Sequence, residues 1–129
     1  VNGLLITGDF NYRNITWDRD GPTLMENASQ HEYNFINAIY DNNLYQNVVT
    51  PSFAPNYEQG PSTFLDLIIT ESSDRIINVS DNPPLGYTQC GRGHSVLDWE
   101  YKIKSSPIIN NNTWRYCYKK GDYSGMEEY

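Results

Sequence analysis

The strongest constraint on the fold is a nearly continuous apolar run, Thr63-Phe64-Leu65-Asp66-Leu67-Ile68-Ile69-Thr70, near the middle of the chain. A run of this length and composition is typical of a strand that is buried on both faces. Asp66 interrupts it, and a carboxylate inside such a strand has an uncompensated desolvation cost unless it has a partner. Two interpretations are open: a capping or turn contact near the strand's end, or a carboxylate that holds a histidine.

A second apolar segment, Gly3–Thr7, predicts another buried strand, and Gly8-Asp9-Phe10-Asn11 follows it directly. Asp9 and Asn11 are therefore expected at the carboxyl end of a strand, where a loop presents them together. The carboxylate can bind a hard cation or accept a proton from water, and the amide can donate to a phosphoryl oxygen. The same residues also form a common exit from a strand into a turn, so alone they do not define a site.

The rest of the chain predicts one helix and several further strands, and hence a mixed α/β sheet domain. Ser29 and Glu32 have the spacing of a capping box, which indicates a helix that begins at Ser29. The helix is expected to end at 41–43 and to bury one face, formed by Phe35, Ile36, Ile39 and Tyr40. Strands are predicted over 44–49, 76–79 and from Ser95 to Lys104, with loops over 12–28, 52–62 and 81–86.

Composition excludes some classes of protein. The chain has 129 residues, which corresponds to one domain or part of one, and a net charge of -7, which argues against tight nucleic-acid binding by this segment alone. We find no apolar run long enough to span a membrane and no signal-peptide pattern. Cys90 and Cys117 lack a paired metal-binding spacing. These features favour an intracellular protein, nuclear or cytoplasmic, with no membrane partner.

A histidine could complete a site with these acidic and amide groups. His94 directly precedes the last strong strand, whereas His31 falls in the first turn of the predicted helix, where a solvated role is expected. A buried Asp66 that bonds one ring nitrogen of His94 would fix its tautomer and leave the other nitrogen for a phosphoryl group or a water. Three strand ends could then converge at one place: the first carries Asp9 and Asn11, the second Asp66 and the third His94.

In this order the residues resemble the second half of an endonuclease/exonuclease/phosphatase domain. The finer resemblance is to the endonuclease that non-LTR retrotransposons encode ahead of a reverse transcriptase. The segments that carry it are Thr7-Gly8-Asp9-Phe10-Asn11-Tyr12, Ile15-Thr16-Trp17, Pro61-Ser62-Thr63 before Leu65-Asp66, Pro83-Pro84-Leu85-Gly86, His94-Ser95-Val96-Leu97 and Tyr116-Cys117-Tyr118-Lys119-Lys120-Gly121-Asp122-Tyr123. The resemblance implies the C-terminal half of a two-sheet, deoxyribonuclease-like α/β sandwich with few helices.

The resemblance also implies roles for the site residues. Asp9 matches the aspartate that positions or deprotonates the attacking water, and it is the one candidate metal ligand. Asn11 matches the asparagine that contacts the scissile phosphate. Asp66 matches the aspartate that orients the catalytic histidine. His94 matches that histidine, which stabilises the transition state. The implied reaction is hydrolysis of a DNA phosphodiester with Mg²⁺ or Mn²⁺, giving a nick that primes reverse transcription.

Two departures from that family pattern point to impaired activity. The family's histidine follows a Ser-Asp pair whose aspartate serves the metal, but here Arg92 and Gly93 precede His94. The family's first half, with its metal-binding glutamate, is also absent. We therefore expect residues 1–104 to be a partial domain and 105–129 to be a linker with a short helical tail from Asp122. The alternatives are an inactive remnant or interaction module of the same fold and, less favoured, a phosphatase.

Overall fold

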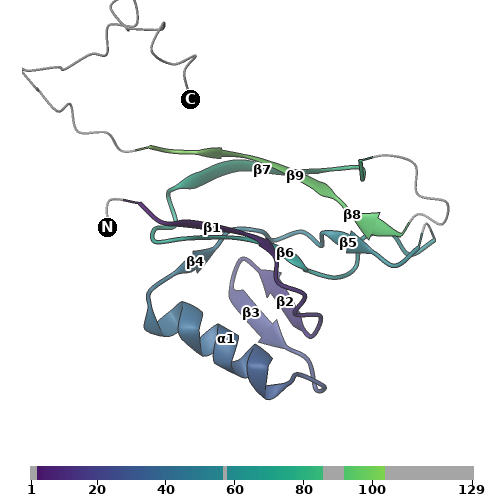
Figure 1. Ribbon diagram of the computed structural model, residues 1–129, viewed down its shortest axis with the longest axis horizontal. Coiled ribbons are helices and arrows are strands. Elements are labelled where there is room, and N and C mark those ends of the chain that lie inside the picture. The colour runs from purple at the N-terminus through teal and green to yellow at the C-terminus, as the bar shows by residue number, and fades with distance from the viewer. Residues whose placement is uncertain (1–2, 57, 86–91, 104–129) are drawn as a thin grey trace, which may run out of the picture.

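The computed structural model describes residues 3–56, 58–85 and 92–103, and Figure 1 shows their arrangement. The elements in chain order are β1 (Leu5–Asp9), β2 (Ile15–Asp18), β3 (Gly21–Leu24), α1 (Gln30–Asp41), β4 (Tyr45–Gln46), β5 (Phe53–Ala54), β6 (Asp66–Thr70), β7 (Ile76–Asn82), β8 (Gly93–His94) and β9 (Val96–Tyr101). The predicted α/β class with few helices is confirmed. The predicted tail helix from Asp122 and the boundary at 104/105 fall outside the described residues.

Strand β6 is the centre of the fold, as the apolar run predicts. It lies between β1 and β4 in an antiparallel three-stranded sheet. Every β6 residue after Asp66 is buried, and Ile68, Ile69 and Thr70 are almost fully enclosed. Both faces of the strand are covered, by α1 and the β2–β3 hairpin on one side and by the β7–β9 ribbon on the other (Figure 1).

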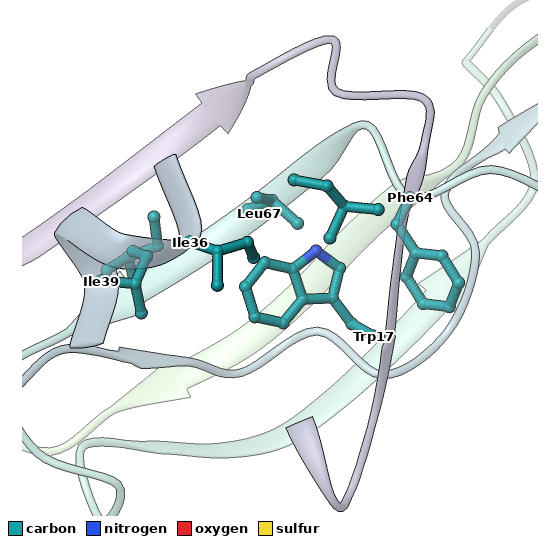
Figure 2. Close-up of a cluster of buried hydrophobic side chains, with 7 residues drawn as sticks. Trp17, Ile36, Ile39, Phe64 and Leu67 are labelled. Carbon is teal, nitrogen blue, oxygen red and sulfur yellow. The ribbon is translucent and has the colours of Figure 1, made fainter. Parts of the chain in front are cut away.

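The larger apolar cluster lies between the sheet and the helix. Leu67 and Ile69 of β6 pack there with residues from the hairpin, the helix and the loop before β6, namely Ile15, Trp17, Ile36, Ile39 and Phe64. Figure 2 shows the Trp17 indole within this cluster, with Ile36 and Leu67 nearby. Burial of several large side chains at one place is the main stabilising term for this half of the molecule.

The opposite face of β6 carries the smaller cluster. Ile68 packs with Val48 and Ile76, and the inner residues of the ribbon, Val79, Leu97, Trp99 and Tyr101, cover them. Within β9, Leu97, Trp99 and Tyr101 are partly buried while Asp98 and Glu100 are exposed. The strand predicted from Ser95 to Lys104 is shorter than expected, because β9 ends at Tyr101 and Ile103 is 79% exposed.

A partly buried ion pair, Arg75–Glu71, links the ribbon to the sheet. Arg75 donates to Glu71 at 2.5 Å and to the carbonyl of Lys102 at 3.0 Å, while the second Glu71 oxygen accepts the N–H of Leu4 at 2.9 Å. The hydrogen bond from the Leu4 N–H holds the pKa of Glu71 below its ordinary value. Desolvation acts against this lowering, and the charge and hydrogen bond of Arg75 add to it. This contact connects the segment before β1 to the end of β9.

The sequence prediction for β1 is wrong in one respect. We expected a buried strand, but all five β1 residues are exposed, with Leu5 42% and Ile6 40% accessible. The reason is that β1 pairs only with β6 among the described strands, and both apolar clusters are centred on β6. Apolar composition alone cannot distinguish an edge strand from a central one.

Several predicted loops and boundaries are also wrong. The segment 12–28 contains the β2–β3 hairpin, in which Ile15 and Trp17 alternate with more exposed residues and enter the core. The 52–62 loop contains β5, and β7 continues through Asp81 and Asn82, where a turn was expected. Conversely, the strand predicted over 44–49 is reduced to β4. These short strands acquire their hydrogen bonds from distant partners, which a local pattern does not show.

The predicted helix is confirmed together with its cap. Ser29 accepts from the backbone of Glu32, and the Glu32 carboxylate accepts from the Ser29 N–H at 2.7 Å, which completes the capping box. Ile36 and Ile39 are buried as expected, but Tyr40 is exposed because it lies at the margin of the apolar face. Glu32 is itself only 4% exposed and also accepts the N–H of Asn14 at 2.9 Å, which connects the helix to the loop before β2.

Glu32 makes the stability of the fold depend on pH. Burial raises the pKa of Glu32, but hydrogen bonds from Ser29 and Asn14 outweigh burial and lower the pKa below its ordinary value of 4.5. The ionised form is therefore favoured in the folded state, and its contribution is lost as pH falls through the folded-state pKa.

We predict that Glu32→Gln lowers the free energy of unfolding at neutral pH by about 1–3 kcal/mol, the value of hydrogen bonds to a charged group. The difference from the wild type should shrink as the pH falls below 4.5, the ordinary pKa of glutamate, toward and through the lowered folded-state pKa of Glu32. Chemical denaturation across pH measures this difference. Glu26→Gln, on the exposed turn before the helix, is the matched control. A constant difference between Glu32→Gln and the wild type at all pH values would contradict the assignment.

Candidate active site

The two aspartates of the candidate site are cross-strand neighbours. In the antiparallel β1–β6 ladder, Asp9 is directly opposite Asp66. The next residue along the chain, Phe10, donates its N–H to the carbonyl of Leu65 at 2.8 Å. Antiparallel pairing thus brings the carboxyl end of β1 to the start of β6. Asp66 is the first residue of its strand and its side chain is 23% exposed, so the carboxylate lies at the sheet's end and not inside the apolar run.

His94 reaches the same end of the sheet from a third segment. It lies in the two-residue strand β8, which pairs with β5 so that His94 is opposite Phe53. Its Nδ1 is 2.7 Å from Oδ2 of Asp66. Because an ionised carboxylate can only accept, the Nδ1–H of His94 is the donor in this bond. The structure therefore brings together the Asp66–His94 pair that the sequence suggested.

The second ring nitrogen faces the other aspartate. Nε2 of His94 is 3.9 Å from Oδ2 of Asp9, too far for a hydrogen bond but close enough for an electrostatic interaction when the ring is charged. The side chains of His94 and Asp9 are 41% and 44% exposed. Nε2 is therefore directed to a solvent-accessible space beside the Asp9 carboxylate, into which a ligand oxygen or a water could enter.

Asn11 is tied to Asp9 by a local turn. Its backbone N–H donates to Oδ1 of Asp9 at 2.9 Å, and Asn11 has a φ of 58°, in the left-handed region that asparagine tolerates better than most residues. Arg13 Nε lies 3.5 Å from Oδ1 of Asn11, at the long limit for a hydrogen bond. With Oδ1 facing Arg13, the side-chain NH₂ of Asn11 remains a donor for a phosphoryl oxygen.

Ser52, which the sequence analysis did not single out, joins the segments that carry the site. It is fully buried, and its hydroxyl oxygen accepts the N–H of Asp66 at 2.9 Å and of Leu65 at 3.2 Å. Its carbonyl accepts the N–H of Ser95 at 2.6 Å, directly after His94. A single serine in a loop carries no pattern that would have revealed this role, because both contacts depend on tertiary structure.

A cavity of about 190 Å³ adjoins Asp66. Thr7, Gly8 and Asp66 line it from the sheet, and Ser95, Leu97 and Trp99 line it from the opposite layer. It lies between strands β1 and β6 of the sheet and the segment from Ser95 to Trp99.

The candidate metal ligand can be tested against the geometry. In the part of the chain that the structure describes, no cluster of three or more His, Cys, Asp or Glu residues could hold a cation by itself. Asp66 is engaged with His94, which leaves the partly exposed Asp9 as one available carboxylate. Mg²⁺ is commonly bound through one or two carboxylates together with substrate phosphates and water. Asp9 fits such a shared site, in which substrate supplies further ligands, and does not fit a closed protein site.

An acid-oriented imidazole that faces a second carboxylate, with an amide donor on the adjoining turn, can chemically serve proton transfer and contact with a phosphate. The chain belongs to the endonuclease-reverse transcriptase family, whose sequence profile matches residues 2–88, more than half of the chain. That match includes Asp9, Asn11 and Asp66, while His94 lies beyond it. The family match supports a retrotransposon-type endonuclease domain. No curated protein and no solved structure gives a significant match.

No helix within the described ranges is long and apolar enough to cross a membrane.

We predict that Asp66→Ala alters the tautomer of His94. In its neutral form the ring of the wild-type protein should carry its proton on Nδ1, because that nitrogen donates to Asp66. Removal of the acceptor should move both ring ¹⁵N shifts toward those of a mixed tautomer, as measured by long-range ¹H–¹⁵N correlation spectra. His31, which is exposed on α1, is an internal reference in the same spectrum. Unchanged His94 shifts in Asp66→Ala would contradict the pairing.

Proposed function

We propose that this domain hydrolyses DNA phosphodiester bonds with the aid of Mg²⁺ or Mn²⁺, as the nicking endonuclease of a retrotransposon. The observation that carries the proposal is the convergence of Asp9, Asp66 and His94 at one end of the sheet, with Nδ1 of His94 2.7 Å from Asp66 and Nε2 3.9 Å from Asp9. The family match supports the endonuclease class. In this proposal the domain acts together with a reverse transcriptase encoded downstream, within the nucleus or cytoplasm.

Each side chain has a distinct role in the proposed reaction. Asp66 orients His94, whose Nε2–H in the charged ring donates to a phosphoryl oxygen as negative charge develops on it. Asn11 offers its side-chain NH₂ to the same phosphate. Asp9 orients the attacking water or accepts its proton. A divalent cation bound at Asp9 and the substrate would supply charge neutralisation at the phosphate.

The expected impairment has a chemical basis in the residues before His94. Gly93 has no side chain, so the position next to the imidazole contributes no carboxylate for a cation, and Asp9 must serve alone among the described residues. Loss of one group that stabilises a transition state commonly lowers the rate by about a hundredfold or more. This observation also favours the second candidate, an inactive remnant that retains the sheet and its binding surface without the chemistry.

A supercoiled-plasmid assay tests the proposal. We predict slow nicking in the presence of Mg²⁺ that a chelator abolishes. Asp9→Ala and His94→Ala should each lower the nicking rate by about a hundredfold or more, because each removes a group at the reacting phosphate. Gly93→Asp should raise the rate by adding a carboxylate beside the imidazole.

Asp20→Ala is the matched control, because it removes an exposed carboxylate from the turn between β2 and β3. Nicking that is equally lost in Asp20→Ala would show an effect of charge and not of the site. A complete lack of metal-dependent nicking in the wild type and in Gly93→Asp, also after the first half of the family's domain is supplied, would reject the nuclease and favour the inactive remnant.

A further inference from the structure

Arg92 lies beside the candidate site, although nothing in the proposed reaction uses it. Its guanidinium carbon is 5.8 Å from the centroid of the Phe53 ring, within the range of a cation–π contact. The other neighbour of that ring is His94, whose imidazole meets it in an edge-on arrangement at 5.0 Å between centroids. One aromatic side chain therefore contacts both a guanidinium and the imidazole of the site.

The backbone of Phe53 is well fixed. Its N–H donates to the carbonyl of Thr63 at 3.0 Å, its carbonyl accepts the N–H of Ser62 at 2.9 Å, and it is opposite His94 in the β5–β8 pair. Ser52, the residue before it, is fully buried. The ring is thus mounted on an anchored strand, and a guanidinium that packs on it loses part of its conformational freedom before any ligand arrives.

The charges around the imidazole explain what such a guanidinium could do. The net charge of the chain is -7, and Asp9 and Asp66 both face His94, so an approaching phosphate meets two carboxylates. Arg13, whose Nε is 3.5 Å from Oδ1 of Asn11, and Arg92, over the ring of Phe53, each bring a positive charge to residues that contact this group. Two arginines therefore balance two aspartates at the site, within a protein that is otherwise strongly acidic.

We propose that Arg92 is a phosphate-binding residue of this site, and that it holds a phosphate oxygen of a phosphodiester substrate beside His94 without a divalent cation. A guanidinium suits this role because its planar array of N–H donors pairs with two phosphate oxygens at once and it remains charged at all relevant pH values. The inference deepens the proposed function, since it assigns a substrate contact, but phosphate binding by Arg92 does not depend on turnover.

The test uses the full chain with ¹³C-labelled histidine in a buffer that contains a chelator. Inorganic phosphate is the probe, and the ring signals of His94 report its binding, while His31 on α1 is the internal reference. We expect a saturable shift of the His94 signals alone. Arg92→Gln should weaken the apparent affinity by roughly tenfold, because a charge-assisted bidentate contact is lost, and Arg92→Lys should retain part of it.

Arg19→Gln is the matched control, since it removes one exposed arginine from the turn between β2 and β3. Three outcomes would overturn the inference: no His94 shift in the wild type, an Arg92→Gln titration equal to that of the wild type, or an equal loss of affinity in Arg19→Gln. Arg92 is exposed in a segment before β8, so the substitution is not expected to affect folding, and an unchanged amide spectrum checks this.

The two proposals fail separately. Phosphate binding that depends on Arg92 in a chain without nicking activity would support the binding site and reject the nuclease. Nicking activity in a chain whose phosphate binding does not depend on Arg92 would support the nuclease and reject the binding site. In DNA binding, Arg92→Gln should also lower the slope of log K against log salt by about 1, as expected for one phosphate contact removed.

Discussion

The site depends on one buried serine. Ser52 accepts the N–H of Asp66 through its hydroxyl and the N–H of Ser95 through its carbonyl. It therefore fixes the first residue of β6 and the residue after His94 with respect to each other, although they are far apart in the sequence. The acceptor atoms of both bonds belong to the fully buried Ser52, and a donor left unpaired in a buried position costs about 1–3 kcal/mol. The short Asp66–His94 contact is a consequence of this anchoring and of the β5–β8 pair.

The sheet provides the second constraint. Since β6 is enclosed by apolar clusters on both faces, a one-residue shift of this strand would exchange Leu67 and Ile69 with Ile68 between two clusters that fit different side chains. That fixed register sets Asp9 opposite Asp66. The acidic pair at the end of the sheet is thus determined by packing of apolar residues several positions away. The Arg75–Glu71 pair similarly fixes the outer ribbon, which continues from the His94 segment.

Much of this could be predicted from the sequence where the signal is local or compositional. The enclosed strand follows from the apolar run at 63–70, and the helix from the capping residues Ser29 and Glu32. The convergence of Asp9, Asp66 and His94 could be anticipated because three strand ends carried polar side chains and the order of motifs resembled a known family. The exposure of β1 and the hairpin at β2–β3 could not, since both depend on which partners cover a segment. The roles of Ser52 and of the Phe53 ring gave no sequence signal, because they too depend on contacts with distant segments.

In the proposed site, Asn11 and His94 come from two separate segments and contact one phosphate. A crystal structure of the domain bound to a short DNA duplex is the test of this arrangement. We expect one backbone phosphate with oxygens within hydrogen-bond distance of both Nε2 of His94 and the side-chain amide of Asn11, while Nδ1 of His94 still bonds Asp66. A duplex bound at another face, or an imidazole turned away from Asp66, would contradict it.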